Sequence, residues 1–248
     1  MKKTALIFFI FFLFIGMLSA QRKSQTIKWF SFAAKAGFGN SVFLNTDHID
    51  DGNVGLNYFS LSQSFGGRLT FTYGDNIGIG SELLFSSYNQ SYSINNNGTL
   101  YDKDVKIKAV DILPFFRYTG NNAAYIELGG KFSRINSVTE TNSIQENFYP
   151  VTNWSDNYES KFTSVFLGFG FALYKNDRLD VNLGARMAYS FSDLTPNYNI
   201  TDDGFYLPDY VKSSATNPIS VQAILEVNYF FAFWGDANCG RGRLMLFQ

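Results

Sequence analysis

The one histidine of the chain, His48, is the first residue to consider for catalysis, with Asp47 beside it and Ser41 nearby. A histidine that is oriented by a carboxylate can activate a serine hydroxyl, which is the chemistry of acyl transfer and hydrolysis. A single histidine among acidic residues in a polar loop is more often simply solvated. We therefore expect the chain not to be an enzyme, and catalysis at His48 stays as an alternative.

Three acidic residues of the same segment, Asp47, Asp50 and Asp51, suggest a second chemistry, the binding of calcium. Their spacing does not match the DxDxDG pattern of a calcium-binding loop. We expect no metal and no cofactor. The only cysteine is Cys239, which excludes a disulfide within the chain.

A larger set of charged side chains recurs along the chain within segments of alternating polarity, always on the polar face. Five are positive and five are negative: Lys35, Arg68, Arg117, Lys131 and Arg186 against Glu82, Asp111, Glu127, Asp180 and Glu226. A buried charge must be compensated, so we expect these residues to form a network of ion pairs in an enclosed lumen. Asp111 with Lys131, or Arg117 with Glu127, remain open as alternative pairs, because they require different registers of one hairpin.

The segment from Phe65 to Phe85 shows how such side chains are positioned. Every second residue on both sides of Gly74–Asn76 is apolar, which predicts a β-hairpin with one apolar face. Arg68 and Glu82 lie at equal distances from this turn on the other face, so we expect them opposite each other.

The same alternation predicts eight strands and an all-β fold. We place them at about 27–38, 59–73, 77–92, 105–118, 124–132, 162–174, 179–191 and 219–233. Short turns at 74–76, 120–122 and 175–177 alternate with long loops at 40–55, 95–104, 137–160 and 194–218. Pro114 lacks a backbone donor and predicts a bulge in its strand. The tail from Gly235 to Gln248 shows no clear strand pattern.

Residues 1–20 have the pattern of a cleaved secretory signal peptide, with Lys2 and Lys3 before an apolar run and Leu18-Ser19-Ala20 at its end. Residues 21–248 then form the mature domain, with a barrel at about 26–234 and a periplasmic tail at 235–248. The mature chain has 18 basic and 21 acidic residues once Lys2 and Lys3 are removed, so no basic face for nucleic acid is expected.

A membrane barrel explains the alternation better than a soluble sandwich or a lipocalin-like barrel. The predicted strands are longer than the ~9–11 residues that cross a bilayer, and the apolar face is almost free of charge. A lipocalin-like barrel would place its apolar face inside. Arg134 and Lys161 interrupt the apolar face at the extracellular strand ends, and both are candidate contacts to lipid phosphate; ordinary snorkelling without a defined ligand is the alternative.

Signal peptide, alternating strands and short turns resemble the OmpX/OmpA-type outer-membrane β-barrel family. Segments such as Ala33–Gly39, Gly78–Phe85 and Val110–Tyr118 look like barrel-domain proteins common in the Bacteroidota. The resemblance covers about Thr26 to Trp234 and implies an up-and-down barrel of eight strands in a Gram-negative outer membrane, with short periplasmic turns and long extracellular loops. The residues that follow Phe233 depart from the family, in which the last strand often ends on a terminal aromatic residue.

An eight-stranded barrel is just wide enough for its own side chains to fill the interior, so we expect no open pore. We expect a structural or surface-interaction role, either envelope integrity or adhesion, with outer-membrane lipid or lipopolysaccharide and envelope or extracellular proteins as partners. An accessory role in a secretion or transport machine is the alternative. Some barrels of this type modify lipid A, which makes His48 the residue to test for catalysis.

Overall fold

The computed structural model describes residues 27–50, 52–73, 76–96, 98–143, 152–153, 157–176, 178–196, 214–235 and 243–246. The predicted signal peptide at 1–20 lies outside these residues. Eight long strands dominate: β1 (Ile27–Leu44), β3 (Leu61–Tyr73), β4 (Ile77–Asn96), β5 (Thr99–Thr119), β6 (Ala124–Asn142), β8 (Lys161–Lys175), β9 (Leu179–Ser190) and β10 (Asn217–Gly235).

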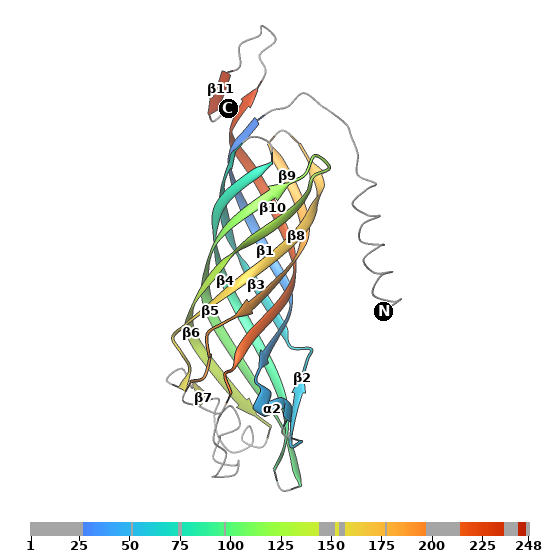
Figure 1. Cartoon of the computed structure of the whole chain (residues 1–248), viewed down its shortest axis with the longest axis vertical. Coiled ribbons are helices and arrows are strands. Elements are labelled where there is room, and N and C mark those ends of the chain that lie inside the picture. The colour runs from blue at the N-terminus through green and yellow to red at the C-terminus, as the bar shows by residue number, and fades with distance from the viewer. Residues whose placement is uncertain are drawn as a thin grey trace, which may run out of the picture.

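These strands form a closed antiparallel barrel (Figure 1). Each pairs with the next along the chain, and β10 returns to β1 in a ladder that runs from Ile27↔Trp234 to Leu44↔Asn217. Closure leaves no strand edge in the barrel wall. The prediction of an eight-stranded up-and-down barrel is confirmed.

Shorter elements lie at the two ends of the barrel (Figure 1). β2 (Val54–Asn57) pairs with β4, β7 (Thr152–Asn153) pairs with β6, and α2 (Thr46–Asp50) follows β1; we call this the loop end. At the opposite, turn end, β11 (Arg243–Leu246) pairs with β10. The expectation of a tail without a strand was therefore wrong. Among the described residues, no helix is long and apolar enough to span a membrane.

The three connections that were predicted to be short lie at the turn end; β4 and β5 are also joined by a short connection, at the loop end. In the β5–β6 turn, the amide of Gly120 donates to the carbonyl of Ala124, and Asn122 Oδ1 accepts from the Ala124 amide. Ala123 takes a left-handed conformation with φ of 64° to close this turn. A side chain at this φ costs about 1–2 kcal/mol.

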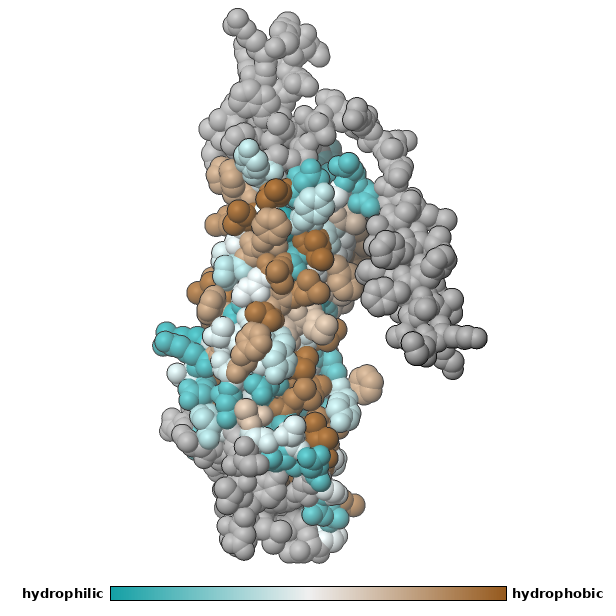
Figure 2. All heavy atoms as spheres, in the orientation of Figure 1, coloured by the Kyte–Doolittle hydropathy of each residue, from teal (hydrophilic) through white to brown (hydrophobic). Residues whose placement is uncertain are grey.

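The barrel wall is apolar outside over its middle, and its charged side chains there point inward, with a small apolar cluster around Leu113 and Phe115 beside them. On β5, Ile112, Phe116 and Tyr118 are about half exposed, while Asp111 and Arg117 are buried. Brown, hydrophobic side chains gather over the middle of the visible face, and hydrophilic ones gather towards the loop end (Figure 2). Water solvates such a belt poorly and hydrocarbon solvates it well, which makes this a transmembrane barrel.

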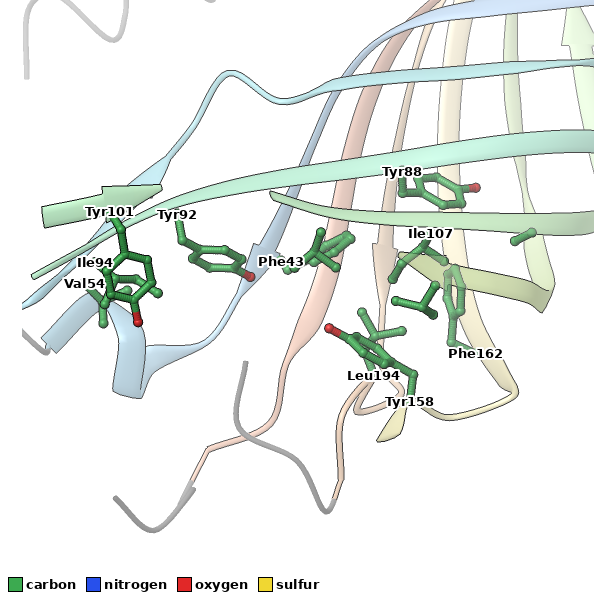
Figure 3. Close-up of a cluster of buried hydrophobic side chains, with 13 residues drawn as sticks. Phe43, Val54, Tyr88, Tyr92, Ile94, Tyr101, Ile107, Tyr158, Phe162 and Leu194 are labelled. Carbon is green, nitrogen blue, oxygen red and sulfur yellow. The ribbon is translucent and has the colours of Figure 1, made fainter. Parts of the chain in front are cut away.

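Nearer the loop end this polarity is reversed. Asp102, Asp104 and Lys106 of β5 point outward, and Tyr101 and Ile107 are buried. The inward residues join an apolar cluster that fills the barrel there (Figure 3). Its buried members are Phe43, Val54, Tyr88, Tyr92, Ile94, Tyr101, Val105, Ile107, Ala109, Val138, Tyr158, Phe162 and Leu194. This part of the barrel has the polarity of a soluble protein.

The reversal explains why most of the predicted strands were too short. The loop expected at Asn95–Asp104 is wrong: β4 and β5 pair up to Asn96↔Thr99, and the serines of β4 donate to Asp102 and Asp104 of β5. β1 and β6 likewise extend to Leu44 and Asn142. The predicted strands end where the outward apolar residues end, because the prediction relied on those residues.

The bulge predicted at Pro114 is also wrong. Pro114 pairs with Ser81 in an unbroken β4–β5 register, and the register towards β6 is the same on both sides of it. The shift occurs between Lys108 and Ala109, which face Ser137 and Ile135 and leave one extra residue in β6. This bulge changes which β6 residues face inward: Ser133 is buried before it and Val138 after it.

Candidate functional site

An ion-pair network crosses the lumen between the middle of the barrel and its turn end. It joins seven side chains from seven of the eight barrel strands: Lys35, Arg68, Glu82, Arg117, Glu127, Arg186 and Glu226. Each is at most 7% exposed. Inward alternation of the strands brings them together, because every second residue of a barrel strand faces the interior. Seven of the ten predicted lumen charges thus meet in one cluster.

Glu226 is the anion with the most partners. Its carboxylate lies 2.6 Å from Arg68 Nη1, 3.1 Å from Lys35 Nζ, and 2.9 Å from Arg117 Nη2. The side-chain amides of Asn182 and Asn228 donate to Glu226 Oε1 at 2.9 and 2.7 Å. The carboxylate is therefore fully coordinated by donors, although it is 0% exposed.

Glu82 and Glu127 connect the other cations. Arg186 donates two parallel hydrogen bonds to Glu82, of 2.7 and 2.9 Å, and a third of 3.0 Å to Glu127 Oε2. Lys35 Nζ lies 2.6 Å from Glu82 Oε1. Arg117 Nε donates to Glu127 Oε1 at 2.8 Å. Such bidentate geometry fixes both position and orientation of the partners.

β8 contributes space to the network. Gly168 of β8 faces Glu127, and a Cβ at this position would lie 3.2 Å from Glu127 Oε2. Aromatic rings support three of the guanidinium groups: Arg117 lies 3.9 Å from the ring centre of Tyr125, Arg186 lies 4.4 Å from that of Phe166, and Arg68 lies 5.2 Å from that of Phe115. These contacts are attractive because the ring face is electron-rich.

The structure decides between the two predicted hairpin pairings. Arg117 lies opposite Glu127 in the β5–β6 ladder and forms an ion pair with it. Asp111 and Lys131 meet through Tyr88: the phenol donates to Asp111, and Lys131 Nζ donates to the phenol oxygen at 3.1 Å. These two charges form a separate cluster, nearer the loop end than Arg117 on β5.

Of two other predictions about the lumen, one is confirmed and one needs correction. Arg68 and Glu82 do lie opposite each other, but their side chains reach across the barrel to Glu226 and Glu127, and to Lys35 and Arg186. Asp180 pairs with Lys175 and Asn228 in its ladders near the turn end and is only half buried, outside the central network. Two charged residues that lie opposite each other in a hairpin need not form an ion pair, because in a closed barrel each inward side chain can also reach side chains of several other strands.

The three residues considered for catalysis, Ser41, Asp47 and His48, each contact other parts of the loop end. His48 is buried against Tyr92, with ring centres 5.7 Å apart. Asp47 accepts from the amide and hydroxyl of Ser214 at 2.8 and 2.6 Å. Ser41 bonds to the backbone of Asn89 on β4. Burial raises the pKa of the Tyr92 phenol well above its usual value, and Glu140 adds to this effect.

Hydrogen bonds tie α2 to the segment before β10. Asn45 caps α2 by accepting from the Asp47 amide, and its own amide group donates to Thr216 Oγ1 at 3.0 Å. Asp193 accepts from the amides of Thr195 and Thr216. The loop end is thus cross-linked over the apolar cluster. Among the residues described, no three histidine, cysteine, aspartate or glutamate side chains lie close enough together to hold a metal ion, and Asp51 lies outside these residues.

Arg134 and Lys161 are exposed, as predicted, and lie directly opposite each other on β6 and β8. The sequence reading missed two neighbours, Lys106 and Lys108, which are exposed on β5. Their even numbering matches Val110 and Ile112, so the parity of the strand would have revealed them. The sequence analysis also missed Asn182 and Asn228, which donate to Glu226. Alternation predicts that both side chains face inward, but it does not predict their hydrogen-bond partner.

The fold and its interior define a class: a transmembrane β-barrel of eight antiparallel strands with an ion-paired lumen. Neither protein-family models nor curated proteins match this sequence.

Several solved outer-membrane barrels are similar in structure. The attachment invasion locus protein Ail of Yersinia pestis is 13% identical over 81% of this chain and 98% of its own, with a TM-score of 0.36. Neisserial surface protein A is 8% identical over 84% and 100%, with a TM-score of 0.37. The Escherichia coli outer-membrane protease OmpT is 10% identical over 83% and 95%, with a TM-score of 0.33. Values this low carry no inference about function.

Proposed function

We propose that the chain is a non-enzymatic outer-membrane barrel with a closed lumen, which acts in envelope integrity or adhesion through its loop end. The outward apolar belt supports residence in a membrane. Closed β-barrels of this kind are typical of the Gram-negative outer membrane, where short turns face the periplasm and longer connections face outward. The turn end is then periplasmic and the loop end extracellular.

The observation that carries the closed lumen is the ion-pair network. Glu226 alone joins β10 to β1, β3 and β5 through Lys35, Arg68 and Arg117. A solute would have to break these buried contacts, each of which becomes costly when one partner is lost. The apolar cluster around Tyr92 and Phe162 blocks the loop half of the lumen in addition.

The absence of catalysis is supported by how His48 and Asp47 are used. The imidazole contacts Tyr92 within the barrel, and both Asp47 oxygens accept from Ser214. Asp47 therefore holds two parts of the loop end together, which is a structural use of its carboxylate.

Planar-bilayer recordings of the purified chain test the closed lumen. We expect no steady conductance from the wild type, and the same from the Glu159→Gln control, whose carboxylate is exposed outside the lumen. A steady, ohmic current in the wild type would refute the proposal. Lipid A mass spectra of cells with the wild type, with His48→Ala and without the chain test catalysis. A modification made by the wild type and lost in the variant would refute a non-enzymatic role.

A gene-deletion strain tests the role itself. Uptake of a hydrophobic dye reports envelope integrity, and adherence to host-derived surfaces reports adhesion. We expect the deletion to change at least one of the two, and re-expression of the wild type or of His48→Ala to restore it. No change in either measurement would contradict the proposed role.

A further inference from the structure

One side of the barrel carries four exposed basic residues at the loop-end edge of the apolar belt: Lys106, Lys108, Arg134 and Lys161. We call this set the basic patch. It spans β5, β6 and β8. On the other described barrel strands, the outward positions at this level hold no lysine or arginine; they include Asn40, Gln63 and Ile219.

The registers place these residues close together. Arg134 lies opposite Lys161 on one side and opposite Val110 on the other, and Lys108 is the next outward residue of β5. Directly opposed side chains have Cβ atoms about 4.5–5.5 Å apart, and diagonal neighbours about 7–8 Å. The extra residue of the β6 bulge is Asn136, two positions after Arg134, so Arg134 is the last outward β6 residue of the transmembrane alternation.

Nothing within the described chain neutralises the patch. None of its four side chains forms an ion pair or a hydrogen bond with another described residue. The acidic groups nearby are Asp102 and Asp104, which accept from serines of β4, and Glu159, exposed before β8. Like charges directly opposite each other destabilise a sheet, so Arg134 and Lys161 require an external anion to be favourable neighbours.

The position of the patch defines that anion. The outward neighbours on the membrane side are Val110, Ile112 and Phe132, which contact hydrocarbon. A molecule that fits both the apolar belt and the basic patch has acyl chains, which pack beside the belt, and phosphate groups, which lie at the edge of the belt. We propose that the basic patch binds the phosphate groups of a phosphorylated glycolipid of the outer leaflet. The inference rests on the proposed outer-membrane location.

Native mass spectrometry of the full chain, released from detergent with lipid A, tests the proposal. A Lys108→Gln/Arg134→Gln variant removes two charges of the patch, and a Lys175→Gln/Arg178→Gln variant removes two exposed charges at the turn end. Each basic residue near an anionic lipid surface contributes roughly 1 kcal/mol, so the patch variant should bind lipid A about 30-fold more weakly. The turn-end variant should bind as the wild type does.

Three results would overturn the assignment: equal binding by the patch variant, equal binding of dephosphorylated lipid A by the wild type, or displacement of lipid A by millimolar inorganic phosphate. The last would show a site for free anions. Heat-dependent gel mobility checks that each variant is folded. Bilayer conductance does not depend on the basic patch. A patch that does not bind lipid A would therefore leave the proposal of a closed lumen unaffected, and a conducting wild type would leave the proposed lipid site unaffected.

Discussion

Replacing Glu226 with glutamine should destabilise the barrel strongly without changing its shape. Glutamine has nearly the same volume and keeps one oxygen, but it removes the charge that faces Lys35, Arg68 and Arg117. The central network holds four cations, Lys35, Arg68, Arg117 and Arg186, and three anions, Glu82, Glu127 and Glu226, an excess of one positive charge. The variant raises this excess to two.

The magnitude follows from the burial of Glu226. Removing one partner of a buried ion pair typically costs 3–5 kcal/mol, because the other charge stays buried and unpaired. Two cations, Lys35 and Arg186, keep Glu82 as a partner, and Arg68 and Arg117 keep Glu127. We therefore expect a loss of about 3–4 kcal/mol in the free energy of unfolding.

Urea titration of the full chain in lipid vesicles, followed by gel mobility, measures this loss. Glu159→Gln makes the same chemical change at an exposed site and should stay within about 0.5 kcal/mol of the wild type. Adding Arg68→Met to Glu226→Gln returns the excess to one positive charge, so the double variant should lose less than the two single variants together. A Glu226→Gln cost below about 1 kcal/mol, or strictly additive costs, would refute the electrostatic reasoning.

Three further predictions concern the wall and the loop end. Gly66→Ala should lower the free energy of unfolding by about 1–3 kcal/mol through overpacking, because the added Cβ would lie 2.0 Å from a backbone oxygen of the next strand. In the control, Gly130→Ala, the added Cβ meets its nearest atom at 3.5 Å, and the loss should be less than about 1 kcal/mol. Equal losses for the two variants in urea titrations would contradict this prediction. Ala123→Gly should stabilise the barrel by about 1 kcal/mol in the same assay, because glycine adopts a positive φ without strain, and a loss would count against it. Asp47→Ala should speed hydrogen exchange at the amide of Ser214 and leave conductance unchanged; unaltered exchange would show that this hydrogen bond is not what protects the amide.

The sequence predicted the barrel because its transmembrane part obeys one rule on all eight strands. Outward residues such as Phe65 and Leu69 are apolar, and the residues beside them are small, polar or charged. The rule failed where the surroundings change from lipid to water: Asp102 and Asp104 continue β5 and point outward, but polar residues at outward positions resemble a loop when apolar ones are expected. The strand ends were therefore the least predictable part.

The sequence predicted which charged side chains face the lumen, but it did not predict which of them form ion pairs with each other. Alternation alone directs Glu226 and Arg68 inward, so both appear among the predicted charges. Their contact depends on how eight strands close around a common axis, which no single hairpin specifies. The β6 bulge is hidden for a similar reason, because one extra residue near Asn136 changes the inward parity and resembles the end of a strand.

The reversal of polarity along the strands has a consequence for assembly. The belt of β5 spans nine residues from Val110 to Tyr118, or roughly 23 Å for a strand tilted by about 40°, close to the height of an outer-membrane apolar band. The apolar cluster around Tyr92 and Ile107 lies beyond that belt, and it can form only after these residues have crossed the bilayer. Once packed, it would have to be dismantled before any strand could slide back. The packed cluster on the far side of the membrane thus opposes withdrawal of the strands, and insertion of the barrel becomes effectively irreversible.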